Sequence, residues 1–342
     1  AAICTHDRPG DAADCLAALC AQDLAEVEVL VVDSASRPAA SQALHQTVST
    51  RPGVRLIRLE RPGLAAARNA ALKAAGAPWI AYLDDDAVPA PDWAMHAKRL
   101  TQEVPAVCSI IAGRVDPLFP ADSVPRAGPR WRQLLSLLQD SGEGEQSGHV
   151  KVVGANVIFR CDALRSIGGF AEALGRKGNV LLSGEEKLAV ELLTAAGFRA
   201  YYSERLRVGH KIPAGRLNRS WAAKRAYWDG ITDQRIRRLL ARPAGLLSVL
   251  KTAAAIPVLA LLAPSRNPAQ EYFIRLWYNI GTLAELAAGE RIEPAGSSGR
   301  PSQGKRPWAS AWERLTGFLR KLLRQSLREK IIPDEARLSL PA

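Results

Sequence analysis

The first hundred residues alternate between two kinds of segment, and this alternation restricts the possible folds more than any other feature of the sequence. Short apolar runs rich in Val and Ile, typical of buried strands, are separated by Ala- and Leu-rich stretches with helical spacing. This pattern predicts an α/β fold with a mostly parallel, Rossmann-type sheet flanked by helices. The runs are Ala2–Cys4, Val27–Val32, Val54–Leu59 and Trp79–Leu83, and the stretches between them are Ala12–Ala21, Ala39–Val48 and Leu64–Ala75.

Polar residues follow three of these predicted strands. Thr5–Pro9 comes after the first strand, Asp33–Ser36 after the second and Asp84–Asp86 after the fourth. Each group alone is more simply explained as a helix cap or an Asx turn. Ligands of parallel sheets, however, bind beyond the carboxyl ends of the strands, where these groups would meet. Their repetition therefore indicates a ligand site at this edge.

The acid run Asp84–Asp86 has a specific chemical use. Three neighbouring carboxylates repel one another, and a bound divalent cation relieves that repulsion. Oxygen ligands favour Mg²⁺ or Mn²⁺, which also bind diphosphate oxygens. Because alternate residues of an extended chain point to opposite sides, we expect one or two of the three carboxylates to contact the metal.

The middle of the chain continues the strand and helix pattern less regularly. We expect Asp116–Ser147, which is rich in Pro, Gly and Ser, to form a long loop of the kind often used in binding. Ser183 is expected to cap the helix Glu185–Ala196, and the chain is expected to become helical and basic after Arg207. The further predicted strands are Ala106–Val115, Val150–Arg160 and the short Phe198–Tyr202.

Five short motifs, in order, resemble those of the family 2 glycosyltransferases with a GT-A fold, and the resemblance covers about two-thirds of the chain. It implies an inverting transfer of a sugar from a nucleotide-diphosphate sugar, most often a UDP-sugar, to a hydroxyl acceptor such as a glycan, a glycolipid or a secondary metabolite. It also implies a divalent metal and a D-x-D motif. The motifs are Ile3–Pro9, Glu28–Ser36, Gly63–Asn69, Tyr82–Asp86 and Gly184–Glu186.

The resemblance assigns roles to individual positions. Asp84 and Asp86 match the D-x-D motif, with the division of metal and ribose contacts among the three acids left open. His210 resembles a late histidine that completes the metal site in some relatives, although a histidine at such a place is as often structural. The expected donor-binding residues are Thr5, Asp7, Arg8, Asp33, Arg68, Asp84 and Asp85, and the expected metal ligands are Asp86, Asp84 and His210.

The transfer also needs a base that accepts the proton of the acceptor hydroxyl. Glu185 and Glu186 stand at a predicted helix N-terminus, where the helix dipole favours the ionised form. The family more often has Glu-Asp here with the second acid as the base, so Glu186 matches that role and Glu185 stays a candidate. Arg216 and Arg225 are interleaved with aromatic residues, and this group either clamps the diphosphate, stacks on an acceptor sugar, or belongs to a packed helix with solvated arginines.

Positive charge is concentrated late in the chain. The net charge is +12, and the stretches Glu204–Arg242 and Lys305–Lys330 together exceed that value, so the remainder is slightly acidic. A basic tail on a near-neutral body is typical of a protein with an anionic partner, although each stretch also suits a solvated helix face. The apolar run Gly245–Ala263 and the basic, Trp-bearing pattern of residues 308–342 favour contact with a membrane surface.

These observations define the expected organisation. Five cysteines without a C-x-x-C spacing predict buried thiols and a reducing compartment. No signal peptide is visible, and the chain begins without Met, so we expect a cytoplasmic protein, peripheral on the inner face of the membrane, that lacks a short N-terminal piece here. The expected parts are a catalytic domain 1–240 (nucleotide-binding half 1–105, acceptor half 106–240), an apolar helical region 241–295, a linker 296–307 and a basic helix and tail 308–342.

Other functions fit less well. No G-x-G-x-x-G follows the first strand and no P-loop occurs, which disfavours a dinucleotide-dependent oxidoreductase and a P-loop enzyme. The acidic sheet edge and the scarcity of aromatics disfavour nucleic acid as a partner. Two alternatives stay open: a sugar-nucleotide nucleotidyltransferase, which would usually carry a Gly-rich basic first loop, and a non-catalytic, membrane-associated protein that binds nucleotide sugars.

Overall fold

The computed structural model describes residues 1–120, 128–139, 142–146, 151–176, 180–242 and 266–287. Residues 1–289 form one compact unit that contains all of them. The apolar run 245–263, the linker 296–307 and the basic segment 308–342 lie outside the described residues. The predictions made for these three segments therefore remain predictions.

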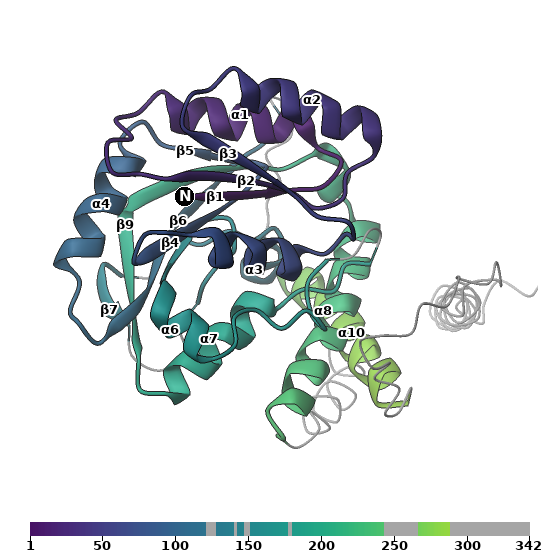
Figure 1. Cartoon of the computed structure of the whole chain (residues 1–342). Helices are drawn as coiled ribbons and strands as arrows, with labels where there is room; N and C mark the ends of the chain where they lie inside the picture. Colours follow the sequence, from purple (N-terminus) through teal and green to yellow (C-terminus); the bar gives the residue numbers. More distant parts are fainter. Residues whose placement is uncertain (121–127, 140–141, 147–150, 177–179, 243–265, 288–342) are drawn as a thin grey trace, which may run out of the picture. The chain divides into compact units, whose positions relative to one another are not determined.

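The N-terminal half is the parallel α/β unit that the sequence predicts. Its four strands pair in parallel in the order β3-β2-β1-β4, with a helix in each connection (Figure 1). All five residues of β2 are buried, which explains their uninterrupted apolar pattern. The elements are β1 (Ala2–Thr5), α1 (Pro9–Cys20), β2 (Val29–Asp33), α2 (Pro38–Ser49), β3 (Val54–Arg58), α3 (Leu64–Ala74) and β4 (Trp79–Asp84).

The second half extends this sheet with mixed pairing. Strand β8 is antiparallel to both β4 and β6, while β6 and β9 run parallel, so the predicted parallel arrangement applies to the first four strands. Further elements are β5 (Ala87–Pro89), α4 (Trp93–Glu103), β6 (Cys108–Leu118), α5 (Pro129–Leu134), β7 (Gly144–Gln146), β8 (Val157–Arg160), α6 (Cys161–Ser166), α7 (Glu185–Ala195), β9 (Arg199–Lys211), a 3₁₀ turn (Ala214–Arg216), α8 (Arg219–Leu239) and α10 (Arg266–Ala287).

Four local predictions are wrong in this half. Strand β9 has 13 residues rather than the five of Phe198–Tyr202, because buried residues alternate there with exposed charges and interrupt the apolar run. Of the predicted strand Val150–Arg160, the described residues 151–160 form a strand only at Val157–Arg160. The expected loop Asp116–Ser147 contains α5 and β7. Ser183 does not cap α7, since the N-cap is Gly184 without a side-chain cap bond.

The sheet has an apolar layer on each face. On one face α1, α2 and α4 contribute Leu16, Leu44 and Trp93, all buried. On the other face α3, α6 and α7 cover the sheet with a layer that includes Phe159 and Phe170 (Figure 1). Helices thus cover both faces of the sheet, as predicted. All five cysteines are free thiols, and four of them are buried, three within these two layers.

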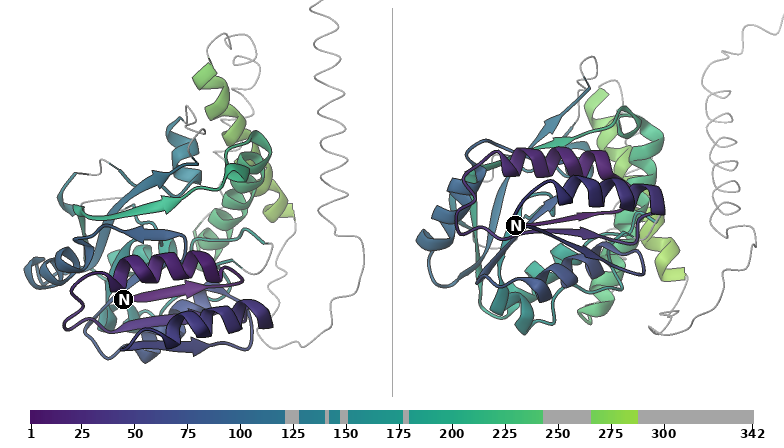
Figure 2. Two further views of the ribbon diagram at one scale, coloured as in Figure 1. Left: turned by 90° about the horizontal axis from the view of Figure 1, so that it is seen from above. Right: turned by 45° about the horizontal axis from the view of Figure 1, so that its top comes forward.

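Helices α8 and α10 lie side by side and cross at very short distance (Figure 2). A methyl group at Gly230 of α8 would overlap the carbonyl oxygen of Tyr278, and one at Gly281 of α10 would overlap that of Tyr227. Two glycines at reciprocal positions therefore allow the two backbones to touch. None of the helices within the described residues is both long and apolar enough to cross a bilayer.

Candidate active site

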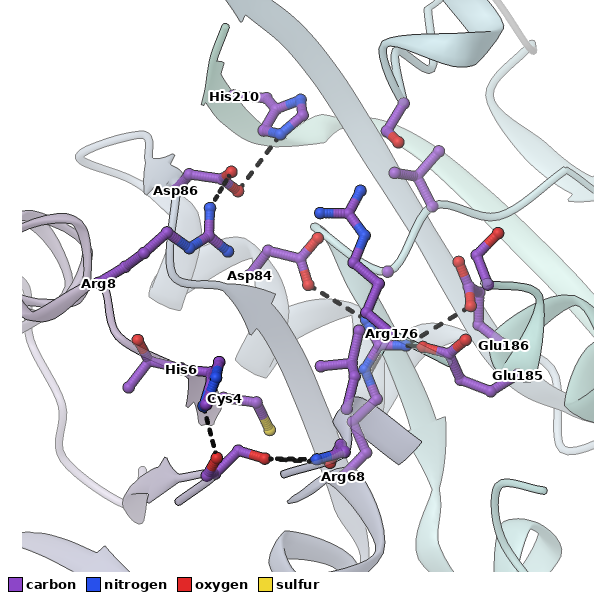
Figure 3. A pocket seen from close by; sticks show the side chains of 18 of the residues that line it. Cys4, His6, Arg8, Arg68, Asp84, Asp86, Arg176, Glu185, Glu186 and His210 are labelled. Atoms are coloured by element: carbon purple, nitrogen blue, oxygen red, sulfur yellow. Dashed lines mark hydrogen bonds and ion pairs between the residues drawn. The ribbon is translucent and has the colours of Figure 1, made fainter. Parts of the chain in front are cut away.

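A cavity of about 290 Å³ opens at the carboxyl ends of β1, β2 and β4. The start of α7, strand β9 and the 3₁₀ turn bring further residues to it, so the lining extends along the chain from Cys4 to Arg225 (Figure 3). Eight of the residues predicted for the site contribute to this lining: Thr5, Arg8, Arg68, Asp84, Asp86, Glu185, Glu186 and His210.

Arg68 joins three elements on one side of the cavity. Its guanidinium, 3% exposed, donates to Glu185 Oε1 over 2.7 Å and to Asp84 Oδ1 over 3.1 Å, and lies 3.5 Å from Glu186 Oε2. Burial alone would lower the pKa of Arg68, but the charges of Glu185, Glu186 and Asp84 raise it above its ordinary value. A side chain at Gly154 would overlap this guanidinium, so the glycine makes room for it.

Asp85 lies beneath the cavity rather than in its lining. Its side chain has no exposure, Thr5 Oγ1 donates to its Oδ2 over 2.7 Å, and Arg8 forms an ion pair with it. Burial, partly opposed by the charge of Arg8, raises the pKa of Asp85 to about 7. This carboxyl group therefore fixes Thr5 and Arg8 in place from below.

Asp86 faces Arg8, Arg216 and His210. Arg8 Nη1 donates to Oδ2 over 2.6 Å, Arg216 Nη2 approaches the same oxygen at 3.4 Å, and His210 Nε2 lies 3.3 Å from Oδ1. The β5–β9 pairing produces the last contact, since Ala87 is in register with His210. Burial would raise the pKa of Asp86, but the hydrogen bond and charge of His210, together with the two arginines, hold it well below its ordinary value.

The orientation of the His210 ring follows from its second nitrogen. Nδ1 lies 3.1 Å from the carbonyl oxygen of Leu135, and a carbonyl can only accept, so Nδ1 carries the proton and donates it. In the neutral ring Nε2 then presents a lone pair to the Asp86 carboxylate. Two acceptors at 3.3 Å attract each other only when a proton or a cation lies between them.

This pair is the part of the site whose chemistry fits a divalent metal. No group of three or more His, Cys, Asp or Glu side chains that could hold a metal occurs within the described ranges. A two-residue site is nevertheless the usual form for Mg²⁺ at a nucleotide, where phosphate oxygens and water complete the shell. Asp84, predicted as a third ligand, also lines the cavity, and its Oδ1 accepts a hydrogen bond from Arg68.

The two glutamates stand at the N-terminus of α7 but differ in exposure. Glu185 is 1% exposed, and its burial, reinforced by the charge of Glu186, raises its pKa to about 8. The side chain of Glu186 is 21% exposed and lines the cavity. Each has an Oε2 atom that accepts no hydrogen bond from the described part of the chain. The residue before them is Gly184, which suits this place for two reasons: its φ is 93°, and a side chain there would press on Thr232 of α8.

Asp7 and Asp33, both predicted to bind the donor, do not line the cavity. The Asp33 carboxylate has no exposure and accepts from Ser36 N, Ser41 Oγ and Arg58 Nη1 at 2.6–2.9 Å. Asp7 accepts two bonds from Arg37 and donates its own N–H to Ser36. Asp7 thus ties the loop after β1 to the loop after β2, whereas Asp33 ties the end of β2 to α2 and β3.

Arg176 is a lining residue that the sequence does not mark. Figure 3 places it between Asp84 and the two glutamates, and no ion pair or hydrogen bond joins its guanidinium to another described residue. Burial and the like charges of Arg225 and Arg216 lower its pKa. No spacing or motif identifies it, whereas Arg216 and Arg225, noted for their aromatic neighbours, do reach the cavity.

Residues 1–167 match the family model described as glycosyl transferase family 2. These residues belong to glycosyltransferase family 2. The resemblance inferred from the five motifs is thereby confirmed, and the cavity is the candidate active site of a glycosyltransferase. The sugar-nucleotide nucleotidyltransferase considered from the sequence does not agree with this membership.

Two curated relatives support the assignment. A glucosyl-dolichyl phosphate glucuronosyltransferase from Haloferax volcanii is 27% identical over 157 residues, which are 45% of this chain and 50% of the relative. The succinoglycan biosynthesis protein ExoM from Rhizobium meliloti is 25% identical over 313 residues, 86% of this chain and 94% of the relative. The chain thus spans about half the length of the first relative and nearly all of the second.

Solved glycosyltransferase structures align over most of the chain. A mannosyltransferase from Pyrobaculum calidifontis, in complex with GDP-Man and Mn²⁺, gives a TM-score of 0.48 at 19% identity and covers 93% of this chain and 79% of its own. Residues 1–349 of TarS from S. aureus, in complex with UDP, give the same score at 15% identity and cover 89% of this chain and 96% of theirs.

Proposed function

We propose that this chain is an inverting, metal-dependent glycosyltransferase that moves a sugar from a nucleoside diphosphate, with UDP as the first candidate, to a hydroxyl acceptor. The observation that carries the proposal is the shared cavity. On one side it presents an Asp–His pair surrounded by arginines, and on the other it presents two glutamates that share a single arginine. The first arrangement suits an anionic leaving group and the second suits proton transfer.

The donor would lie along the sheet edge. Thr5, His6 and Ser34, with the turn Pro62–Leu64, line the end of the cavity suited to a nucleoside. The diphosphate would then lie near Arg8 and the other arginines that project into the cavity. Guanidinium groups bind phosphate oxygens through paired, charge-assisted hydrogen bonds, which fits this lining.

Asp86 and His210 would hold the Mn²⁺ or Mg²⁺ ion. Such an ion supplies Lewis-acid stabilisation of the charge that develops on the leaving diphosphate. The Leu135 carbonyl keeps the His210 ring turned so that Nε2 faces Asp86, and Arg8 and Arg216 add positive charge on the same side. Asp84 would act by holding Arg68 in place, and Asp85 by holding Thr5 and Arg8.

Glu186 would be the catalytic base. It is the more exposed of the two glutamates, and its side chain lines the cavity, where an acceptor hydroxyl can approach. Glu185 has almost no exposure and a pKa of about 8, so at neutral pH it mainly keeps its proton. Attack from the Glu186 side, opposite the leaving group, inverts the anomeric centre in one displacement.

The acceptor proposed here is a lipid-linked saccharide. One relative is a transferase whose name gives glucosyl-dolichyl phosphate, a sugar on a lipid phosphate, as its substrate. The basic, apolar C-terminal segments predicted from the sequence would bring the enzyme to such an acceptor on the inner face of the cell membrane. Residues 1–240 together with α10 would form the catalytic domain, and the segments 245–263 and 308–342 would be the membrane-directed parts.

A donor panel tests this function. The protein is incubated with UDP-, GDP- and dTDP-sugars, with and without Mn²⁺, and released nucleoside diphosphate is measured. We expect one donor to be hydrolysed slowly in the presence of metal and more rapidly with an acceptor. Binding of the same donors without any release would support the non-catalytic alternative and would overturn the proposal.

A further inference from the structure

Helix α10 holds the N-terminal end of α5. Gln270 Oε1 accepts from the backbone N–H of Gly128 over 3.1 Å, and Glu271 Oε1 accepts from that of Arg130 over 3.0 Å. Glu271 Oε2 also lies 3.3 Å from Arg130 Nε. The first N–H groups of a helix have no partner within it, so two side chains of a distant helix satisfy donors that α5 cannot satisfy itself.

The opposite end of α5 contacts the active site. Its C-cap residue Leu135 supplies the carbonyl oxygen that accepts from His210 Nδ1, and the next residue, Ser136, lines the cavity with φ 58°. Trp131, Leu134 and Leu135 are buried, so α5 packs as a unit against the body of the domain. One helical segment therefore connects Glu271 to the His210 ring.

The helix α5 depends on such contacts for its position. It has six residues, far fewer than an isolated helix needs to be stable in water. Carboxylates are also favoured at a helix N-terminus by the helix dipole, which makes Glu271 the stronger of its two caps. Loss of this carboxylate would release the N-terminal end of α5.

Helix α10 itself is firmly attached to the wall that carries the catalytic glutamates. Tyr278 donates to Asp233 of α8 over 2.5 Å, and Lys187 of α7 donates to the same carboxylate over 2.7 Å. Glu285 binds Arg235 and Arg238 of α8. Because of these contacts, a displacement of α5 relative to α10 changes the distance between the His210 side and the α7 side of the cavity.

We propose that Glu271 is a positioning residue of the active site: by capping α5 it holds the Leu135 carbonyl against His210 and so fixes which ring nitrogen faces Asp86. The proposal rests on the proposed function for its kinetic consequence. The orientation of the ring can be measured without any turnover.

The first test is nitrogen NMR of the ligand-free protein with labelled histidine, with the His210 signals assigned by their loss in His210→Gln. In the wild type we expect a protonated Nδ1. In Glu271→Ala we expect these resonances to shift or broaden as the ring exchanges between tautomers. Glu285→Ala is the matched control, since it removes the same charge from the same helix without contacting α5 in the described residues. Unchanged His210 signals in Glu271→Ala would overturn the proposal.

A double-mutant cycle tests the kinetic route. Loss of groups that orient metal ligands typically lowers metal affinity or activity 10- to 100-fold, so we expect Glu271→Ala to lower kcat/KM by about 10-fold. In the His210→Ala background the same change should have almost no further effect, because both act through one ring. Fully additive losses would mean that Glu271 acts only on stability, against the proposal.

Two milder variants keep the test decisive if Glu271→Ala fails to fold. Glu271→Gln retains an amide oxygen for the Arg130 N–H and should preserve most of the wild-type His210 signal. Gln270→Ala removes only the bond to Gly128 and should perturb that signal less than Glu271→Ala but more than Glu285→Ala. If the wild type turns over no donor while its His210 signals respond as described, the proposed function fails and the positioning role stands.

Discussion

The two sides of the cavity carry opposite charge excesses. On the Asp86 side, formed by Arg8, Asp86, His210 and Arg216, one carboxylate is surrounded by two arginines and a histidine. On the Arg68 side, Glu185 and Glu186, together with Asp84, share a single arginine, and oxygens of both glutamates accept no hydrogen bond from the described residues. The excess positive charge on the Asp86 side suits binding of an anion such as a diphosphate. The excess of carboxylates on the Arg68 side leaves one of them available to accept a proton.

The largest effect is expected on the Arg68 side. Glu186→Gln keeps the shape of the side chain but cannot accept a proton, and loss of a general base typically costs about 10²- to 10⁴-fold in rate. We expect sugar transfer to fall by about 1000-fold, with donor affinity within about 3-fold of the wild type. Steady-state kinetics and equilibrium titration with the nucleoside diphosphate separate these two quantities. If Glu185→Gln lost its transfer activity instead and Glu186→Gln kept full activity, Glu185 would be the base and Glu186 would not.

Arg68→Met tests the charge balance on the same side. It leaves buried carboxylates without their shared cation, and breaking such a buried pair costs about 3–5 kcal/mol. We expect the free energy of unfolding, measured with urea, to fall by that amount. The control is Arg55→Met, whose ion pair with Glu28 is exposed and should contribute no more than about 1 kcal/mol. If both variants lost a similar amount of unfolding free energy, Arg68 would contribute no more to stability than an exposed ion pair, which would contradict this prediction.

Arg216→Ala tests the Asp86 side. Its guanidinium is one of several cations facing that side, and charged hydrogen bonds contribute about 1.5–3 kcal/mol each. We expect KM for the donor to rise by about 10-fold, with kcat reduced less. Arg219→Ala is the comparison, because this neighbouring arginine is exposed and has no place in the cavity lining. Unchanged KM in Arg216→Ala would remove it from the diphosphate site.

A further effect concerns the pH dependence of stability. The folded pKa of Glu185, about 8, lies above its ordinary value of 4.5, so between those values the folded state binds more protons than the unfolded state. Stability therefore falls as pH rises through this window, by at most roughly 1.4 kcal/mol for each pH unit. Asp85, with a pKa of about 7, acts in the same direction. In Glu185→Gln the free energy of unfolding, measured with urea, should depend less on pH between pH 5 and 8. An unchanged pH dependence would contradict the raised pKa of Glu185.

The sequence predicts some residues of the cavity and misses others. Thr5 and Asp84–Asp86 are found because they follow buried, uninterrupted strands whose ends must meet at one edge of a parallel sheet. Arg68 lies on α3 and is found only through the family resemblance of its motif. Arg176 is not found, since it lies in a segment without periodicity and reaches the cavity only through tertiary folding.

Asp33 illustrates a different limit. The motif places it correctly at the end of β2. Its carboxylate, however, accepts hydrogen bonds from Ser41 of α2 and Arg58 of β3, and the motif does not show these contacts. The cap of α7 fails as a prediction for a similar reason. Ser183 Oγ accepts from Arg225 on α8, 42 residues away, so the helix begins at Gly184 instead.

The central claim is that a cation held between Asp86 and His210 contacts the diphosphate of the donor. The direct measurement is the shift in Tm on adding UDP and GDP, each with and without Mn²⁺, for the wild type, Asp86→Asn and His210→Gln. A ligand that binds only the folded state raises Tm. We predict that Mn²⁺ enlarges the shift in the wild type and that both variants lose this metal-dependent part. A nucleotide shift that is independent of Mn²⁺, or that stays fully metal-dependent in both variants, would contradict the claim.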